Sequence, residues 1–222
     1  MPEDPVPDRR VLERGYVERC AAYAAVLEAF EQRLRELFQA GTVRPTIKGR
    51  VKSFDSYYRK LLRKLREQPA RDALPPISDI LGVRIICPFL EDLRDAERLV
   101  HERLQVVSVE RKGCHRSVRE FGYESTHLMV RVPEDILYHH RLSGEPVCEV
   151  QVQTILQNAW SEVEHELVYK AGFSPFDEPL RRKLAALNAM LTLSDTIFQE
   201  IRDYQSSLHA FVPENLGTRF SP

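Results

Sequence analysis

The sequence predicts an α+β protein, in which a β-sheet is flanked by helices and a long helix lies at each end of the chain. Apolar runs of strand length alternate with amphipathic segments in the middle of the chain, while both ends carry helical apolar spacing. The chain has 222 residues, of which 43% are hydrophobic, and this suits one domain with helical extensions. We expect a disordered N-terminus over 1–8, a single domain over 9–210 and a tail over 211–222.

The first predicted helix covers residues 9–40. Its apolar side chains recur in steps of three and four residues, and Gly41 is a typical helix end. The number of heptads is too small for a free coiled coil, so we expect this stripe to pack on the core. The stripe consists of Tyr16, Cys20, Tyr23, Leu27, Phe30, Leu34 and Leu37.

A second helix is predicted over 54–66, with Ser53 as its N-cap, apolar side chains on one face and basic ones on the other. Strands are then expected at Val83–Phe89, Val106–Glu110, 123–132 and Val147–Gln153. A helix over 92–104 separates the first two strands, and a polar loop over 112–122 precedes the third.

The last two predicted helices cover 155–170 and 178–210, and together with 9–40 they extend a core of about 45–170. In the first of them we expect an inward face made of Leu156, Ala159, Trp160, Val163 and Leu167. The second has apolar residues at helical spacing, namely Leu180, Leu184, Leu187, Leu191, Phe198 and Ile201.

Charge is distributed unevenly along the chain. The formal net charge is −1, yet nine basic residues and a single acid, Asp55, lie between Arg44 and Arg66. This concentration favours a compact polyanion such as a nucleotide as the ligand, and a solvated basic helix face is the alternative. No apolar run approaches the ~20 residues of a membrane span. The acidic, proline-rich start is unlike a targeting peptide and the four cysteines are scattered, so we expect a cytoplasmic protein with reduced thiols.

Two candidate sites precede the first predicted strand. Lys48, Arg50, Lys52 and Ser53 lie at the entry of the basic helix, where unpaired backbone N–H groups suit a phosphate. Asp79 lies in a turn that leads into Val83–Phe89; it is either a helix cap or a ligand of Mg²⁺. On the strand itself, Arg84 faces away from its apolar neighbours and is able to stack on a base.

Two further candidate sites lie on later strands. Tyr123, Ser125 and His127 share one strand face, which suits either a nucleotide or an ordinary half-exposed polar surface. Glu149, Gln151 and Gln153 form a polar row opposite Cys148, Val150 and Val152. In a cleft, Glu149 suits either metal binding or the removal of a proton from a hydroxyl group. Asn158, one turn into the next helix, has an amide that suits a base edge.

The chain lacks the P-loop, dinucleotide-binding, HExxH and GxSxG motifs. The residues alone therefore predict a nucleotide-phosphate site with one or two carboxylates.

Four segments, in this order, resemble the synthetase domain of the RelA/SpoT family, whose members make the alarmones ppGpp and pppGpp. They are Gly49–Ser53, Asp79–Cys87, Gly122–Leu128 and Glu149–Thr154, the last followed by Trp160, Glu164-His165 and Tyr169-Lys170. Long members of the family carry hydrolase and regulatory domains as well, for which 222 residues leave no room. The chain therefore looks like a small alarmone synthetase.

The resemblance implies a mixed β-sheet related to that of nucleotidyltransferases. It implies that Arg50 and Arg84 clamp the adenine of ATP, while Lys48, Lys52 and Ser53 serve its phosphates. Asp79 and Glu149 would hold Mg²⁺, and Glu149 would also accept the proton of the acceptor's 3′-hydroxyl, with AMP as the leaving group. The acceptor, which is GDP, GTP or GMP, would meet Lys112, Arg116, Tyr123, His127, Gln151 and Asn158.

In these roles Tyr123 stacks on guanine, His127 contacts the acceptor phosphates and the loop 112–122 closes over the acceptor. Relatives form homo-oligomers through their terminal helices, so a tetramer or a dimer is expected. Two residues depart from the family pattern: Gln153 stands where many members have Arg, and Glu124 stands where a basic residue is common. Both changes reduce the positive charge near the acceptor side. They leave the preference among GMP, GDP and GTP undecided, but they do not affect the expected reaction.

Two rival readings remain. Some small relatives are toxins that pyrophosphorylate the 3′ end of tRNA, and the basic segment 44–66 would suit RNA. The overall acidity and Asn158 argue against this reading. A non-catalytic nucleotide-binding module is the second rival, and the presence of both Asp79 and Glu149 argues against it.

Overall fold

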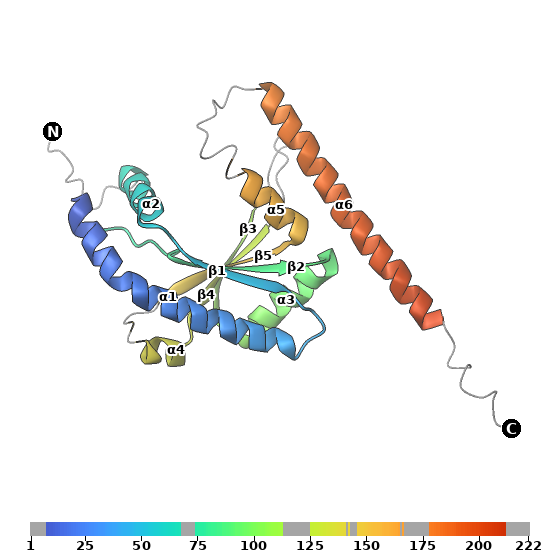
Figure 1. The fold of residues 1–222 in the computed structure, drawn as a ribbon, viewed down its shortest axis with the longest axis horizontal. Helices are drawn as coiled ribbons and strands as arrows, with labels where there is room; N and C mark the ends of the chain where they lie inside the picture. The colour runs from blue at the N-terminus through green and yellow to red at the C-terminus, as the bar shows by residue number, and fades with distance from the viewer. Residues whose placement is uncertain are drawn as a thin grey trace.

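A computed structural model describes residues 8–67, 74–112, 125–140, 142, 146–164, 166 and 178–211. Its centre is a five-stranded sheet in the order β1-β2-β5-β4-β3 (Figure 1). The strands are β1 (Thr46–Val51), β2 (Leu81–Cys87), β3 (Val106–Lys112), β4 (Ser125–Arg131) and β5 (Val147–Thr154). Only β2 and β5 pair in parallel and the other three pairings are antiparallel, so the sheet is mixed, as predicted.

The two faces of the sheet differ in polarity because successive side chains alternate between them. One face carries the buried aliphatic residues of the three middle strands, and the other carries polar residues at the intervening positions. Cys87 and Cys148 lie on the aliphatic face as buried free thiols, which confirms the prediction for the apolar runs. The core is therefore one-sided and leaves the polar face for chemistry.

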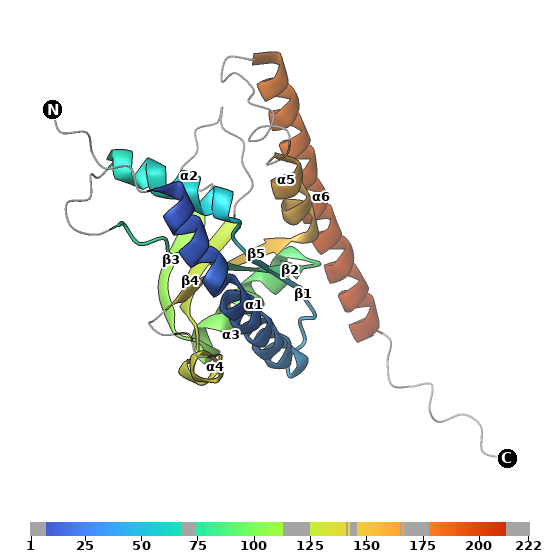
Figure 2. The same ribbon diagram turned by 60° about the vertical axis from the view of Figure 1, so that its left-hand side comes forward.

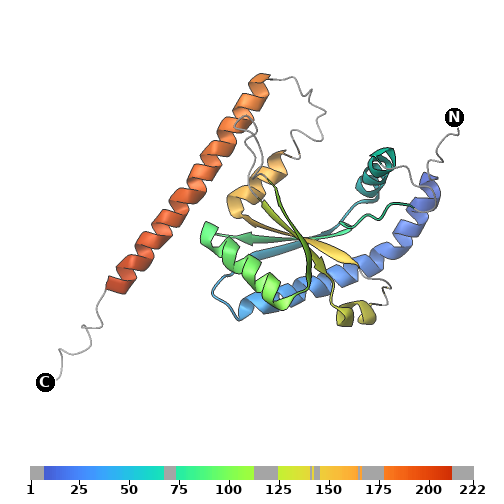
Figure 3. The ribbon, with the colours of Figure 1, turned by 180° about the vertical axis from the view of Figure 1, so that it is seen from behind.

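Helices α1 (Arg9–Gln39), α3 (Leu90–Arg103) and the short α4 (Glu134–His139) lie on the aliphatic side of the sheet (Figure 3). Helix α1 packs its apolar stripe on the core, as predicted, and seven of its residues are buried. Its N-cap is Asp8, whose side chain accepts a hydrogen bond from the backbone N–H of Arg10 at 2.8 Å.

Helices α2 (Phe54–Glu67) and α5 (Ile155–Glu164) flank the polar side (Figure 3). Ser53 caps α2 as predicted, since its hydroxyl accepts a hydrogen bond from the backbone N–H of Ser56 at 3.4 Å. The long helix α6 (Glu178–Phe211) lies at the edge of the molecule beside α5 and α3 (Figures 1 and 2). No helix in the described parts of the chain has the length and apolar character that a membrane crossing requires.

Three sequence predictions need correction. Lys48-Gly49-Arg50 lie in strand β1, not in the approach to a helix, because Thr46–Val51 pair along the whole edge of β2. Helix α4 lies between the last two predicted strands, where the sequence predicts no helix; it is six residues long, too short for a periodic signal. In α5, Trp160 is buried but Val163 is 43% exposed, and Gln157 takes the second buried position.

Candidate active site

The register of the sheet brings candidate residues from separate segments into rows on its polar face. Lys48 pairs with Arg84, Arg84 with Gln151, and Gln151 with His127, so one row crosses four strands. The next row joins Arg50, Gly82 and Glu149. Paired residues in a sheet share a face, and these side chains therefore converge over β1, β2, β5 and β4.

These rows form the floor of a cleft of about 410 Å³, a volume typical of small-molecule sites. Helix α5 provides one wall through Glu162, and the turn before β2 provides another through Asp79. Gly82 has no side chain and lies between Arg50 and Glu149 in its row, where an added Cβ would come no closer than 3.8 Å to any atom beyond its immediate chain neighbours. The lining residues are Lys48, Gly49, Arg50, Asp79, Gly82, Val83, Arg84, Glu149, Gln151, Glu162 and Glu166.

Positive charge is concentrated at the β1–β2 side of the cleft. Lys48 lies directly opposite Arg84 in the ladder, an arrangement that like charges oppose unless an anion or a carboxylate compensates. Burial, and then the nearby charge of Arg50, lower the pKa of the Arg84 guanidinium, which nevertheless stays protonated at neutral pH. Glu162 compensates in part, since its Oε1 accepts from Arg84 Nη1 at 3.1 Å. This side of the cleft suits a polyanion.

Asn158 joins the same group of side chains. Its Oδ1 accepts one hydrogen bond from Arg84 Nη1 at 3.0 Å and another from Gln153 Nε2 at 3.1 Å. Gln153 is 2% exposed and holds this amide through its side-chain nitrogen. The amide of Asn158 and the guanidinium of Arg84 thus form one hydrogen-bonded unit at the start of α5.

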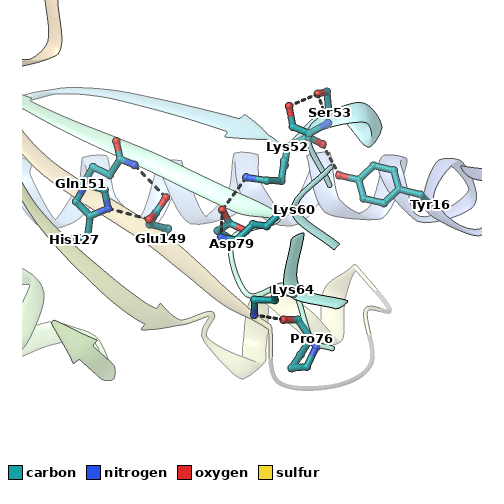
Figure 4. A network of polar contacts seen from close by, with 11 residues as sticks. Tyr16, Lys52, Ser53, Lys60, Lys64, Pro76, Asp79, His127, Glu149 and Gln151 are labelled. Atoms are coloured by element: carbon teal, nitrogen blue, oxygen red, sulfur yellow. Dashed lines mark hydrogen bonds and ion pairs between the residues drawn. The ribbon is translucent and has the colours of Figure 1, made fainter. Parts of the chain in front are cut away.

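Glu149 is held by a hydrogen bond on each of its carboxylate oxygens (Figure 4). His127 Nδ1 lies 2.9 Å from Oε1, and Gln151 Nε2 donates to Oε2 at 3.0 Å. An ionised carboxylate only accepts, so Nδ1 carries the proton and Nε2 accepts from the Ser125 hydroxyl at 3.1 Å. The exposed fractions are 18% for the Glu149 side chain and 10% for that of His127. This carboxylate is oriented and still reaches the cleft.

Asp79 is held on one oxygen only. Lys52 Nζ lies 2.7 Å and Lys60 Nζ 2.8 Å from Oδ2, whereas Oδ1 is buried and makes no hydrogen bond (Figure 4). Burial raises the pKa of the Asp79 carboxyl, but the hydrogen bonds and charges of the two lysines outweigh it and lower the pKa overall. Asp79 is therefore ionised in the fold and has one oxygen available for a further cation.

Two carboxylates, Asp79 and Glu149, line the same cleft, and this donor set fits Mg²⁺. The ion is commonly held by one or two carboxylates together with substrate phosphates. In the described ranges no group of three or more His, Cys, Asp or Glu residues is placed to hold a metal by itself. The protein side chains would therefore need phosphate oxygens to complete the coordination of a metal.

The structure brings most of the predicted site residues together. Lys48, Arg50, Asp79, Arg84, Glu149 and Gln151 line the cleft, and Lys52, His127 and Asn158 bind its lining residues. Ser53 begins α2 at an exposed position, and Lys112 ends β3 opposite Ser125. Arg116, Tyr123 and Glu124 lie outside the described residues.

Lys60 and Glu162 were not identified from the sequence as site residues. The sequence marks Lys60 only as one cation of the basic segment, whereas in the structure it lies on α2 and reaches the same carboxylate as Lys52. A further contact fixes the segment between β1 and α2, where the hydroxyl of Tyr16 donates to the backbone carbonyl of Lys52. Burial raises the pKa of Tyr16 to about 12, so this donor keeps its proton.

Comparisons with known proteins agree with this geometry. Residues 49–173, more than half of the chain, match a region found in RelA/SpoT proteins. GTP pyrophosphokinase YwaC of Bacillus subtilis is 36% identical over 125 residues, which are 55% of this chain and 57% of that protein. GTP pyrophosphokinase YjbM of the same organism is 30% identical over 176 residues, 78% of this chain and 79% of that protein.

Among solved structures, small alarmone synthetase 2 from Bacillus subtilis has a TM-score of 0.66 and 25% sequence identity. The similarity covers 83% of this chain and 97% of that one. The chain spans just over half of the length of YwaC, about four fifths of YjbM and nearly all of the solved structure. By its matched region, its relatives and its sheet, the chain belongs to the RelA/SpoT family.

Proposed function

We propose that the protein is a (p)ppGpp synthetase, which moves the β,γ-pyrophosphate of ATP to the 3′-hydroxyl of GDP or GTP and releases AMP. The observation that carries this proposal is Glu149, held at both oxygens inside a cleft whose opposite side is cationic. Family membership and two relatives named GTP pyrophosphokinase support the same reaction.

The donor nucleotide occupies the β1–β2 side of the cleft in this proposal. Arg50 and Arg84 lie on neighbouring strands, where flat guanidinium groups are able to stack on the two faces of adenine. Lys48 and Lys52 then provide charge-assisted hydrogen bonds to the phosphates, and Ser53 provides a hydroxyl. Binding of the nucleotide would relieve the repulsion between Lys48 and Arg84.

Glu149 acts as the general base. Its carboxylate takes the proton of the acceptor's 3′-hydroxyl, the 3′-oxygen forms a bond to the β-phosphorus of ATP, and the bond from that phosphorus to the α–β bridging oxygen breaks. The bridging oxygen and its electron pair leave with AMP. Because His127 and Gln151 hold the carboxylate before the substrates arrive, little reorganisation is needed at the proton transfer.

The acceptor lies on the β4–β5 side in this proposal, against Gln151 and Asn158, while His127 orients Glu149. Lys112 and Arg116 would bind its phosphates, and Tyr123 would stack on its guanine. The loop after β3 and the first residues of β4 therefore complete the acceptor site.

Mg²⁺ is the proposed cofactor, and Asp79 and Glu149 would hold it. When bound, the ion neutralises the charge of the transferred phosphates. The free Oδ1 of Asp79 supports this assignment, because a buried carboxylate oxygen without a partner is costly unless a ligand satisfies it.

The test is transfer of label from γ-labelled ATP, with GMP, GDP, GTP and bulk tRNA offered separately in the presence of Mg²⁺. We expect a labelled guanosine nucleotide, and a fall of at least ~100-fold in kcat for Glu149→Gln. Label on tRNA alone would replace the proposal with the RNA-modifying activity. Absence of transfer to every acceptor would leave only nucleotide binding.

We also propose that the protein self-associates through α6. Seven apolar side chains repeat in steps of three or four residues along this helix and are 42–66% exposed, namely Leu187, Met190, Leu193, Ile197, Ile201, Tyr204 and Leu208. A second copy of the same helix is self-complementary to such a stripe.

A further inference from the structure

Helix α5 begins with two reciprocal hydrogen bonds. The backbone N–H of Gln157 donates to Thr154 Oγ1 at 3.0 Å, and the backbone N–H of Thr154 donates to Gln157 Oε1 at 2.8 Å. This is a capping box, which satisfies two otherwise unpaired donors and sets the angle between β5 and α5. Both residues are buried, with exposed fractions of 0% and 6%, so the geometry is shielded from water.

A residue of α6 completes this cap from outside. The Thr154 hydroxyl donates to Asp195 Oδ2 at 2.7 Å, and Asp195 is 3% exposed. A threonine hydroxyl has a single hydrogen, so donation to Asp195 directs the oxygen lone pairs toward the N–H of Gln157. A buried carboxylate needs compensating hydrogen bonds, and the Thr154 hydroxyl provides one of them. The contact therefore points to a role beyond packing.

The cap leads directly to the cleft. Asn158 is the residue after Gln157, and its Oδ1 accepts from Arg84 and from Gln153. A rotation or shift of the first turn of α5 would move this oxygen away from the Arg84 guanidinium. Two buried hydrogen bonds at Thr154 and one part-buried hydrogen bond at Asn158 therefore lead from Asp195 to Arg84.

Helix α6 has a second anchor at the start of α3, just after the neighbouring strand β2. Arg202 Nη1 lies 2.6 Å from Asp92 Oδ1, and its guanidinium lies 4.7 Å from the centre of the Phe89 ring. Phe89 follows β2, the strand that carries Arg84, and Asp92 is 3% exposed. Helix α6 is thus attached at the carboxyl ends of both parallel strands, at Thr154 of β5 and just after β2. The apolar stripe of α6 takes part in neither of these two contacts.

We propose that Asp195 is a positioning residue for the donor side of the site: through Thr154 it sets the first turn of α5 and so the place of Asn158 and Arg84. Asp195 itself contacts no substrate. The kinetic consequence rests on the proposed function, whereas the effect on α5 does not.

The test compares Asp195→Ala, Thr154→Val and the double variant. We expect each single variant to raise the KM for ATP about tenfold, the scale of one hydrogen bond to a charged group. We expect the double variant to fall no further than Thr154→Val, because loss of the hydroxyl already removes the contact between Thr154 and Asp195. Thr154→Ser keeps the hydroxyl, so its KM for ATP should stay near that of the wild type. Thr196→Ala is the control, since Thr196 is exposed beside Asp195 and its hydroxyl binds only within α6.

Trp160 provides a readout that does not depend on catalysis. It is the single tryptophan of the chain, lies two residues after Asn158 and is 4% exposed. We expect its fluorescence emission to change in Asp195→Ala and Thr154→Val and to stay unchanged in Thr154→Ser and Thr196→Ala. If the wild-type protein transfers no pyrophosphate, the proposed function fails while this comparison still decides the positioning role.

The proposal would be overturned by a folded Asp195→Ala protein that loses thermal stability but keeps both its Trp160 emission and its KM for ATP. Fully additive effects of Asp195→Ala and Thr154→Val would overturn it as well. If Asp195→Ala does not fold, Thr154→Val and Thr154→Ser carry the test, because the first removes the hydroxyl that donates to Asp195 and the second keeps it.

Discussion

The two carboxylate oxygens of Asp79 differ in their contacts. Two ammonium groups converge on Oδ2, from β1's end and from α2, while Oδ1 stays buried without a partner. The cluster of one acid and two bases carries a net positive charge, so it is neutralised only in part without a ligand. Phosphates would draw the lysines away and leave the carboxylate to a metal, which couples metal and nucleotide binding.

Asp79→Asn should lower the free energy of unfolding at pH 7 by roughly 1–3 kcal/mol, because two partly buried lysines lose their counter-charge. The folded pKa of Asp79 is lowered, so its contribution is complete above the unfolded value of about 3.9. It is lost as the pH falls through the folded pKa. Urea unfolding at pH 7 and pH 3 should therefore show a difference between the two proteins that shrinks on acidification.

Asp135→Asn is the matched control for this comparison. Its pKa is also lowered, chiefly by the hydrogen bond from Arg33, but the pair is exposed, with side-chain exposures of 40% and 57%. Surface pairs of this kind contribute little to stability. An equal loss for Asp79→Asn and Asp135→Asn at pH 7 would contradict the role given to burial.

His127→Gln should lower kcat about 10- to 100-fold and leave the KM for the acceptor nearly unchanged, because the imidazole orients Glu149 at 2.9 Å. A direct contact between His127 and the acceptor phosphates predicts the reverse, a raised KM with kcat retained. Steady-state kinetics with GDP varied at saturating ATP separates the two roles. Ser125→Ala, which affects only the far nitrogen, should have a smaller effect on kcat than His127→Gln.

Period-two alternation was sufficient to predict Glu149 and Gln151, because both faces of β5 follow directly from its sequence. The partners of these residues were a different matter. Lys60 meets Asp79 and Glu162 meets Arg84 across 19 and 78 positions of sequence, and both contacts depend on where α2 and α5 settle against the sheet. No local pattern encodes that placement. The pairing of acidic and basic side chains in the cleft is therefore seen in the structure and does not follow from the local sequence.

At the scale of elements, β1 is a strand that the sequence did not predict. Thr46–Val51 contains a glycine and two cations and has few apolar residues, so its intrinsic strand signal is weak. Its conformation comes from pairing with β2 along its whole length. By contrast, β2, β5 and the long helices were predictable because their apolar spacing is strong and local. Edge strands of this composition depend on tertiary contacts.

Gly49→Ala should lower the free energy of unfolding by roughly 1–3 kcal/mol through overpacking of β1 on α1. An added Cβ would lie 2.2 Å from Glu31 Oε1 and 3.0 Å from Leu27 Cγ. Gly82→Ala is the control on the neighbouring strand, where the closest atom would be 3.8 Å away. Thermal or urea unfolding measures both, and combining Gly49→Ala with Glu31→Ala should restore part of the loss. Equal stability of the two glycine variants would contradict close packing as the cause.

At the scale of the whole molecule, α6 has two functional sides. At 100° per residue, Asn188, Asp195 and Arg202 lie on the side that faces the body, and two of them bind it through buried polar contacts. The exposed apolar stripe lies on the opposite side of the helix. Figures 1 and 3 show α6 at the margin of the molecule, where that opposite side is accessible to a second copy. The predicted domain limits of 9–210 would therefore include an assembly element.

Ile197→Glu should shift the protein toward the monomer, with a dissociation constant raised at least ~10-fold, because it places a charge at the centre of the apolar stripe. Ile197 is 43% exposed within one copy, so the substitution should leave the monomer's thermal stability nearly unchanged when unfolding is measured at low concentration. Sedimentation velocity over a concentration series measures the association. Thr196→Glu adds the same charge at the adjacent exposed position outside the stripe, and it should associate like the wild type. A wild-type chain that stays monomeric at all concentrations would contradict assembly through α6.

Because the body-facing side of the same helix carries Asp195, a variant that separates the copies is also expected to change the emission of Trp160 if assembly restrains α6.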